Sequence, residues 1–165
     1  MANLVYIAPA TPITWTDDTT GGTYTLDIGG LAAGSVRNGD QGDLGAGDRA
    51  DYYDWSMVVD GFDTAPVVGE EIHLYLAFGR GTTDIDGDLG ATDAASSTVV
   101  LPNLLHIGTL VVQTTTAANE LRTSGRVYIT HRYVTPVLYN ATADALLSTS
   151  DAHTFTLTPV PFEIQ

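Results

Sequence analysis

Three aspartates at alternate positions, Asp84, Asp86 and Asp88, form the segment of this chain that most resembles a metal site. Carboxylate oxygens gathered in one loop are the ligands that calcium prefers in proteins. An EF-hand loop places its glycine after the third acidic position and a glutamate at the twelfth; here the glycine comes earlier and the twelfth residue is Ala95. We therefore predict a solvated acidic turn and no metal, with calcium held by these three residues and Asp93 as the alternative.

The glycine-rich run 38–48 has the composition of a phosphate-binding loop. Such loops bind phosphate through backbone N–H groups at a helix N-terminus, usually with a lysine. This run instead contains Asp40, Asp43 and Asp48, and the chain has no lysine. Because carboxylates would repel phosphate, we predict a flexible arm that becomes ordered against a neighbouring subunit.

Residues for nucleophilic or acid–base catalysis do not form a known motif. The histidines His73, His106, His131 and His153 are more than twenty residues apart, so we expect each at a strand surface or edge. No GxSxG motif surrounds a serine, and the pair Ser124-Gly125 indicates a turn. We predict no enzymatic activity, no catalytic residue and no cofactor. A hydrolase whose catalytic residues are far apart in the sequence and meet only in the folded protein is kept as an alternative hypothesis.

Two sets of residues bear on carbohydrate chemistry. Glycosidases need a pair of carboxyl groups with separated pKa values, and no pattern marks such a pair among Glu70, Glu71, Glu120 and Glu163. The aromatic residues Tyr52, Tyr53 and Trp55 could stack on sugar rings. We expect instead that Tyr53 and Trp55 belong to the core and that Tyr52 is exposed.

The charge balance is strongly acidic and excludes two classes of partner. The 165 residues carry a net charge of −14, and the six basic residues are all arginines. Binding to nucleic acid or to an anionic membrane needs cations on the protein. We therefore predict neither partner.

The chain has no cysteine, which excludes disulfide bonds, zinc sites built from thiolates and cysteine nucleophiles.

The first residues lack the basic and apolar regions of a secretory signal, so we expect a protein made without an export signal. Apolar stretches elsewhere are much shorter than the roughly 20 residues that span a bilayer.

Alternation of apolar and polar residues with period two predicts strands. Tyr53, Trp55 and Met57, for example, alternate with Asp54 and Ser56. Threonine, valine, isoleucine and tyrosine favour a half-buried pleated surface, and most glycines and prolines fall between the runs. The predicted strands are 13–16, 23–28, 53–60, 71–78, 98–101, 106–113, 126–133, 134–139 and 153–158.

These elements predict an all-β fold: an antiparallel β-sandwich of about eight strands, similar to a jelly roll. Helix is expected only in short connectors such as 117–121 or 143–147. Two long acidic, glycine-containing loops, 29–50 and 79–97, are the segments that we expect to contact another molecule. We predict a single domain over residues 1–165, with possible terminal arms at 1–12 and 159–165.

Several separated segments resemble structural proteins in the virions of tailed bacteriophages, particularly the decoration or cement proteins of the head. The matching residues extend from about Asp43 to the last residue and contain no catalytic motif. They are Asp43-Leu44-Gly45, Tyr53, Trp55, Thr64-Ala65-Pro66, Gly69-Glu70, Tyr75-Leu76-Ala77, Asp86-Gly87-Asp88-Leu89-Gly90, Asp93-Ala94, Leu104, Ile107-Gly108, Ser124-Gly125, Arg132-Tyr133-Val134-Thr135-Pro136-Val137, Phe155-Thr156-Leu157-Thr158-Pro159 and Glu163-Ile164-Gln165.

The resemblance implies a non-enzymatic protein that binds the assembled shell of the major capsid protein as a symmetric oligomer, with a trimer favoured. Its place would be the capsid surface of the virion, after synthesis in the host cytoplasm. Docking would use an exposed apolar or edge-strand patch, and the candidates are the terminal runs with Leu4, Val5, Ile7, Val160, Phe162 and Ile164. A carbohydrate-binding or adhesion module of the tail or head is the alternative.

Overall fold

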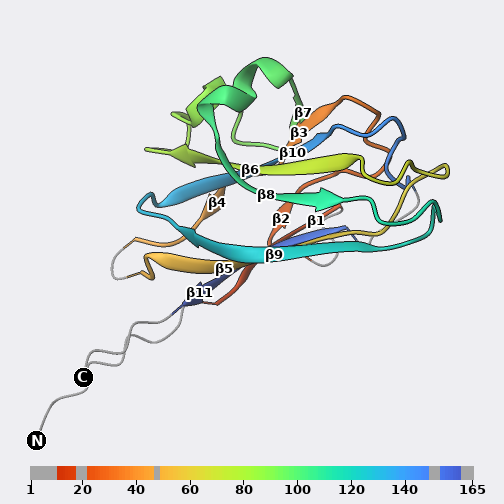
Figure 1. Cartoon of the computed structure of the whole chain (residues 1–165). Coiled ribbons are helices and arrows are strands. Elements are labelled where there is room, and N and C mark those ends of the chain that lie inside the picture. The colour runs from red at the N-terminus through yellow and green to blue at the C-terminus, as the bar shows by residue number, and fades with distance from the viewer. Residues whose placement is uncertain (1–10, 18–21, 47–48, 149–152, 161–165) are drawn as a thin grey trace, which may run out of the picture.

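The computed structural model describes residues 11–17, 22–46, 49–148 and 153–160, and its regular structure is almost entirely β. Two sheets pack face to face (Figure 1). The first has the order β2-β1-β11-β5-β9, with bounds Tyr24–Thr25, Ile13–Thr16, Thr154–Val160, Tyr52–Val59 and Leu121–Tyr128. The second has the order β7-β3-β10-β6-β8, with bounds Ala94–Ser96, Val36–Asn38, Tyr133–Asn140, Glu71–Gly79 and Leu105–Val111, and β4 (Gly42–Asp43) also pairs with β10.

The strand order is that of a jelly roll. In the first sheet β1 pairs with β11, β11 with β5 and β5 with β9. In the second sheet the equivalent sequence is β3 with β10, β10 with β6 and β6 with β8. All these pairs are antiparallel, and β1 with β2 is parallel. The predicted all-β, jelly-roll-like sandwich is therefore confirmed.

Alternation along β5 and β6 decides which side chains form the core. Tyr53, Trp55 and Met57 point between the sheets and are at most 4% exposed. Ile72 and Leu74 of β6 are fully buried opposite them. This confirms the predicted core positions of Tyr53 and Trp55.

Two glycines make room for the Trp55 ring between the sheets. Gly125 lies opposite Trp55 in β9, and a Cβ there would sit 2.8 Å from the ring. Gly108 of β8 faces the same ring from the second sheet. The prediction that Ser124-Gly125 forms a turn was wrong, because this glycine lies inside a strand where a side chain would collide with the indole.

Both segments predicted as long loops contain regular structure. The segment 29–50 supplies β3 and β4, whose two or three residues are too short to show an alternating pattern. The segment 79–97 supplies β7 and the 3-10 helix η1 (Asp86–Asp88). Residues 98–101, predicted as a strand, begin the 3-10 helix η2 (Thr98–Asn103); the Ser97 side chain caps its first turn.

Residues 80–104 fold over the outer face of the second sheet, at the top of Figure 1. Six buried apolar side chains form a second, smaller core there, apart from the one between the sheets. They are Val36, Ala77, Ile85, Leu89, Leu101 and Val137.

Other boundaries also differ from the prediction. Strand β9 covers Leu121–Tyr128 rather than 126–133, since its polar and glycine residues conceal the alternation. Residues 117–121 form a turn that leads into β9, and residues 143–147 form a bend and an isolated bridge between Leu146 and Phe62, so neither segment is a helix. Strand β2 has two residues of the predicted 23–28. Among the residues described, no helix has the length and apolar character needed to cross a membrane.

The predicted terminal arms fall largely outside the described residues. Residues 1–10 and 161–165 are not described, and they include the apolar candidates for docking except Val160. The predicted C-terminal arm 159–165 was wrong for its first two residues, because Pro159 and Val160 pair with β5 as part of β11.

Candidate functional site

The aspartates named for calcium do not come together. Asp86 accepts a hydrogen bond from the Phe78 N–H at 3.3 Å, near the end of β6. Asp93 instead forms an ion pair with Arg37 and accepts from the Asp27 N–H at 3.0 Å. Among the described residues no group of three or more histidine, aspartate or glutamate side chains is arranged to hold a metal ion.

Asp40 and Asp43, the described aspartates of the run 38–48, form hydrogen bonds with distant segments of the chain. A carboxylate oxygen of Asp40 accepts from the Thr25 N–H at 2.9 Å, and the Trp15 indole donates to the Asp40 carbonyl at 2.8 Å. Asp43 holds Arg132 through two bonds of 2.8 and 2.6 Å, and this partner lowers the pKa of the Asp43 carboxyl. The described part of this run is therefore ordered within one chain, and its prediction as a flexible arm was wrong there.

Two histidines 33 positions apart meet on the outer face of the second sheet. His73 of β6 and His106 of β8 have ring centroids 5.7 Å apart, and both rings contact the Thr109 hydroxyl at 3.2 and 3.1 Å. Tyr139 stacks on His73, and Tyr75 meets His106 edge-on. Burial lowers the pKa of His73.

Pairing of β6 with β8 creates this cluster, and a register shift after Leu74 brings Tyr75 opposite His106. No short-range pattern in the sequence could reveal this cluster.

The other two histidines lie outside the cluster. His131 stacks on Phe78 with centroids 4.9 Å apart. His153 is 1% exposed, so its predicted place at a strand surface or edge was wrong.

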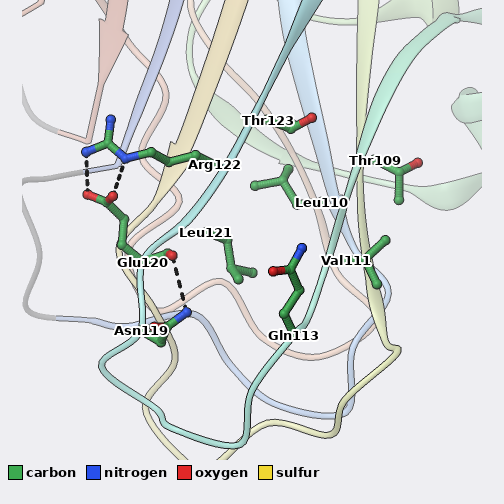
Figure 2. Close-up of a pocket in the computed structure, with 9 residues that line it drawn as sticks. All are labelled: Thr109, Leu110, Val111, Gln113, Asn119, Glu120, Leu121, Arg122 and Thr123. Carbon is green, nitrogen blue, oxygen red and sulfur yellow. Dashed lines mark hydrogen bonds and ion pairs between the residues drawn. The ribbon is translucent and has the colours of Figure 1, made fainter.

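A pocket of about 230 Å³ lies where the edge strands β8 and β9 face each other across the sandwich (Figure 2). Leu110 and Leu121 contribute apolar surface. Gln113 and Asn119 add amides, and Arg122 is bound to Glu120 at the rim. The lining offers hydrogen-bond donors and acceptors with no histidine, cysteine or serine among its nine residues, so it suits a small polar ligand better than nucleophilic chemistry.

The outer face of the first sheet presents the outward side chains of β5 and β9. We call it the β5–β9 face; its residues are Tyr52, Asp54, Ser56, Val58, Arg122, Ser124, Arg126 and Tyr128. Strand register places them in four facing pairs, with Tyr52 opposite Tyr128 at one end and Val58 opposite Arg122 at the other. As predicted, Tyr52 is exposed, at 41%, and Tyr128 is 53% exposed.

Polar contacts fix the middle of this face. Arg126 donates from Nε and Nη2 to the two Asp54 carboxylate oxygens at 2.7 and 3.2 Å. This contact lowers the pKa of Asp54. Beyond it, Ser56 faces Ser124, and a shallow hollow of about 290 Å³ opens beside Arg122. The arrangement presents aromatic rings, one ion pair and hydroxyls on one surface.

Comparison with known proteins gives no family assignment. No family model and no curated protein matches the chain. Among solved structures, murine APRIL at pH 5.0 matches with 12% identity over 95% of both chains and a TM-score of 0.43. The CBM22-1 and GH10 modules of Clostridium thermocellum xylanase 10B, complexed with xylohexaose, match with 10% identity and a TM-score of 0.25 over 98% of this chain and 25% of that chain. Both scores are too low to bear on function.

Proposed function

We propose that this protein is a non-enzymatic structural protein of a tailed-phage virion, a capsid decoration or cement protein that binds the assembled major capsid shell and stabilises it. It would be made in the host cytoplasm and act on the virion surface as a homo-oligomer, with a trimer favoured. It would bind neither nucleic acid nor membrane, and no reaction is part of its role.

The observation that carries the proposal is that residues of the phage-like pattern meet in space. Trp55 packs against Gly108 and Gly125, although these residues are about 50 to 70 positions apart. Asp43 pairs with Arg132 through two hydrogen bonds. The resemblance therefore covers positions on which one fold depends, which supports a shared architecture more than scattered identities would.

A further contact of the same kind lies in residues 80–104, the segment that folds over the outer face of the second sheet and that we call the excursion. Gly87 has a φ of +75°, which favours glycine, and a Cβ there would lie 3.2 Å from the Leu104 side chain. Both residues belong to the phage-like pattern. This contact extends the argument to residues 80–104, outside the main core.

Charge also supports attachment by shape rather than to nucleic acid. Four of the six arginines, Arg37, Arg122, Arg126 and Arg132, are ion-paired with carboxylates of the same chain. Their charge is therefore locally neutralised in a chain of net charge −14. The phosphate backbone of a nucleic acid would therefore be repelled by the net negative charge of the protein.

Adding the purified protein to shells that lack it tests the proposal. We expect saturable co-sedimentation, added density on the outside of the shell in electron micrographs, and a higher melting temperature of the particle. Free DNA should not bind. Failure to bind any shell, or turnover of a substrate traced to a named side chain, contradicts the assignment.

The terminal arms are the proposed attachment points, and a variant tests them separately. Replacing Leu4 and Ile7 with aspartate should weaken co-sedimentation, because burying two carboxylates in an apolar contact is costly. Leu105→Ala, a change at an exposed residue of the second sheet, is the control and should bind normally. Equal binding of all three proteins would contradict attachment through the N-terminal arm.

A second candidate function, carbohydrate binding in an adhesion module, is favoured by the exposed tyrosine pair of the β5–β9 face.

A further inference from the structure

We infer that the β5–β9 face binds an uncharged polysaccharide chain lying along the two strands. This goes beyond shell binding, since it gives the protein a second ligand on a surface that the shell proposal does not use.

The aromatic pair supplies a surface for the apolar side of a sugar ring. Tyr52 and Tyr128 have ring centroids 5.2 Å apart with planes tilted by 51°. The two side chains are 41% and 53% exposed. Adjacent exposed aromatic rings form an apolar patch on the surface, and the apolar side of a sugar ring can pack on such a patch.

The polar groups beside the pair suit hydroxyls. Arg126 uses Nε and Nη2 on Asp54, which leaves Nη1 and further carboxylate lone pairs available for a ligand. Both side chains are more than half exposed. Next along the strands come the Ser56 and Ser124 hydroxyls, which can donate or accept. A sugar chain carries both kinds of hydroxyl partner at every ring.

Charge selects an uncharged ligand. The outward side chains of β1, β11, β5 and β9 include one carboxylate, Asp54, and two guanidinium groups, Arg122 and Arg126. Arg126 is paired with Asp54, and Arg122 is paired with Glu120, which directly precedes β9. This face is nearly neutral, while the molecule as a whole carries −14. An anionic polysaccharide would be repelled by the net negative charge of the whole molecule, whereas a neutral chain would not.

Shape favours an extended chain over a protein partner. The hollow of about 290 Å³ beside Arg122 lies at the end opposite the tyrosines, so ligand-sized features occur along a track of seven residues, or six steps of the strand. At about 3.3 Å per residue this track is roughly 20 Å long. Its middle is made of serines and one ion pair rather than the apolar centre typical of a protein interface.

Affinity electrophoresis of the full chain tests the inference, with hydroxyethylcellulose, a mixed-linkage β-glucan or a galactomannan in native gels as neutral probes. We expect at least one to retard the protein. Tyr52→Ala and Tyr128→Ala should each weaken the apparent affinity at least tenfold, because each removes a stacking ring. Tyr52→Phe keeps the ring and should bind within about threefold of wild type.

Leu105→Ala is the matched control, since Leu105 is 42% exposed but lies on the second sheet. Its mobility should equal that of wild type, and dextran sulfate should retard none of the proteins. The inference is overturned if no neutral probe retards the wild type, or if both alanine variants bind as wild type does.

Parallel co-sedimentation with shells separates this inference from the proposed function. We expect both tyrosine variants to bind shells normally. Loss of shell binding in these variants would identify the β5–β9 face as the shell contact and overturn the inference. Retardation without any shell binding would support the inference while rejecting the decoration role.

Discussion

His153 is a buried imidazole held in its neutral form by the geometry of its partners. Its Nδ1 accepts from the Asp60 N–H at 2.9 Å, and its Nε2 lies 3.1 Å from the Leu147 carbonyl, which can only accept. Nδ1 therefore has no proton and Nε2 has one. Burial lowers the pKa of His153; the bond to Leu147 opposes this, and Asp17 lies 3.8 Å from Nε2.

This lowered pKa predicts a loss of stability in mild acid. The unfolded chain takes up the proton first, near pH 6.5, so the contribution of His153 is complete above that pH and declines as pH falls below it. Urea unfolding between pH 7.5 and 5 should show this decline. In His153→Asn, which keeps an acceptor for Asp60, the decline should be smaller, and in the control His131→Asn it should equal that of wild type. An unchanged decline in His153→Asn would contradict the assignment.

Gly125 gives a second test at the residue scale, because the Trp55 ring occupies the space of its missing side chain. Gly125→Ala should lower the free energy of unfolding by about 1–3 kcal/mol through overpacking. Gly90→Ala is the control, since nothing lies within 4 Å of its added Cβ. Chemical denaturation measures both variants, and equal stability of the two would show that the Trp55 site can expand freely.

At the scale of elements, the excursion 80–104 is stabilised by its own small core. Leu101 of η2 is 9% exposed and packs with buried residues of the second sheet, whereas Val99 of the same 3-10 helix is 79% exposed. The strands beneath are also held by the larger core between the sheets. The excursion should therefore loosen before the sandwich does.

Leu101→Ala tests this separation. We expect faster amide exchange over residues 80–104, with protection in β10 and β6 largely retained, because the lost contacts belong to the smaller core. A cost of about 2–3 kcal/mol is typical of such a truncation. Val99→Ala should exchange as wild type does. Equal loss of protection in both sheets would mean that the excursion and the sandwich unfold together.

At the scale of the whole molecule, charge opposes self-association. Copies with a net charge of −14 repel one another, so an oligomer needs a specific contact whose strength exceeds that repulsion. Added salt screens the repulsion over about 10 Å at 0.1 M. Oligomerisation of this protein should therefore become easier as salt is raised.

The proposed trimer gives a direct measurement. Light scattering coupled to gel filtration should give a mass about three times the 17.4 kDa of one chain at moderate salt. The fraction of oligomer should increase with salt and with protein concentration. A mass of one chain under all conditions would contradict the oligomer while leaving the fold unaffected.

The sequence by itself determined the class of fold and much of the core. Burial on one face of a strand is a local property with period two, so Tyr53, Trp55 and Met57 were identifiable from their alternation with polar residues. Composition likewise determined the charge and the absence of cysteine. Neither property depends on which strand lies beside which.

Only the tertiary structure decided what pairing brings together. Strands β3 and β4 are too short to show a period, and β9 has polar residues and a glycine where Trp55 needs space. The neighbours His73 and His106, and Tyr52 and Tyr128, are set by strand register between segments far apart along the chain. Such contacts depend on the whole arrangement of the sheets, so no local pattern of residues can encode them.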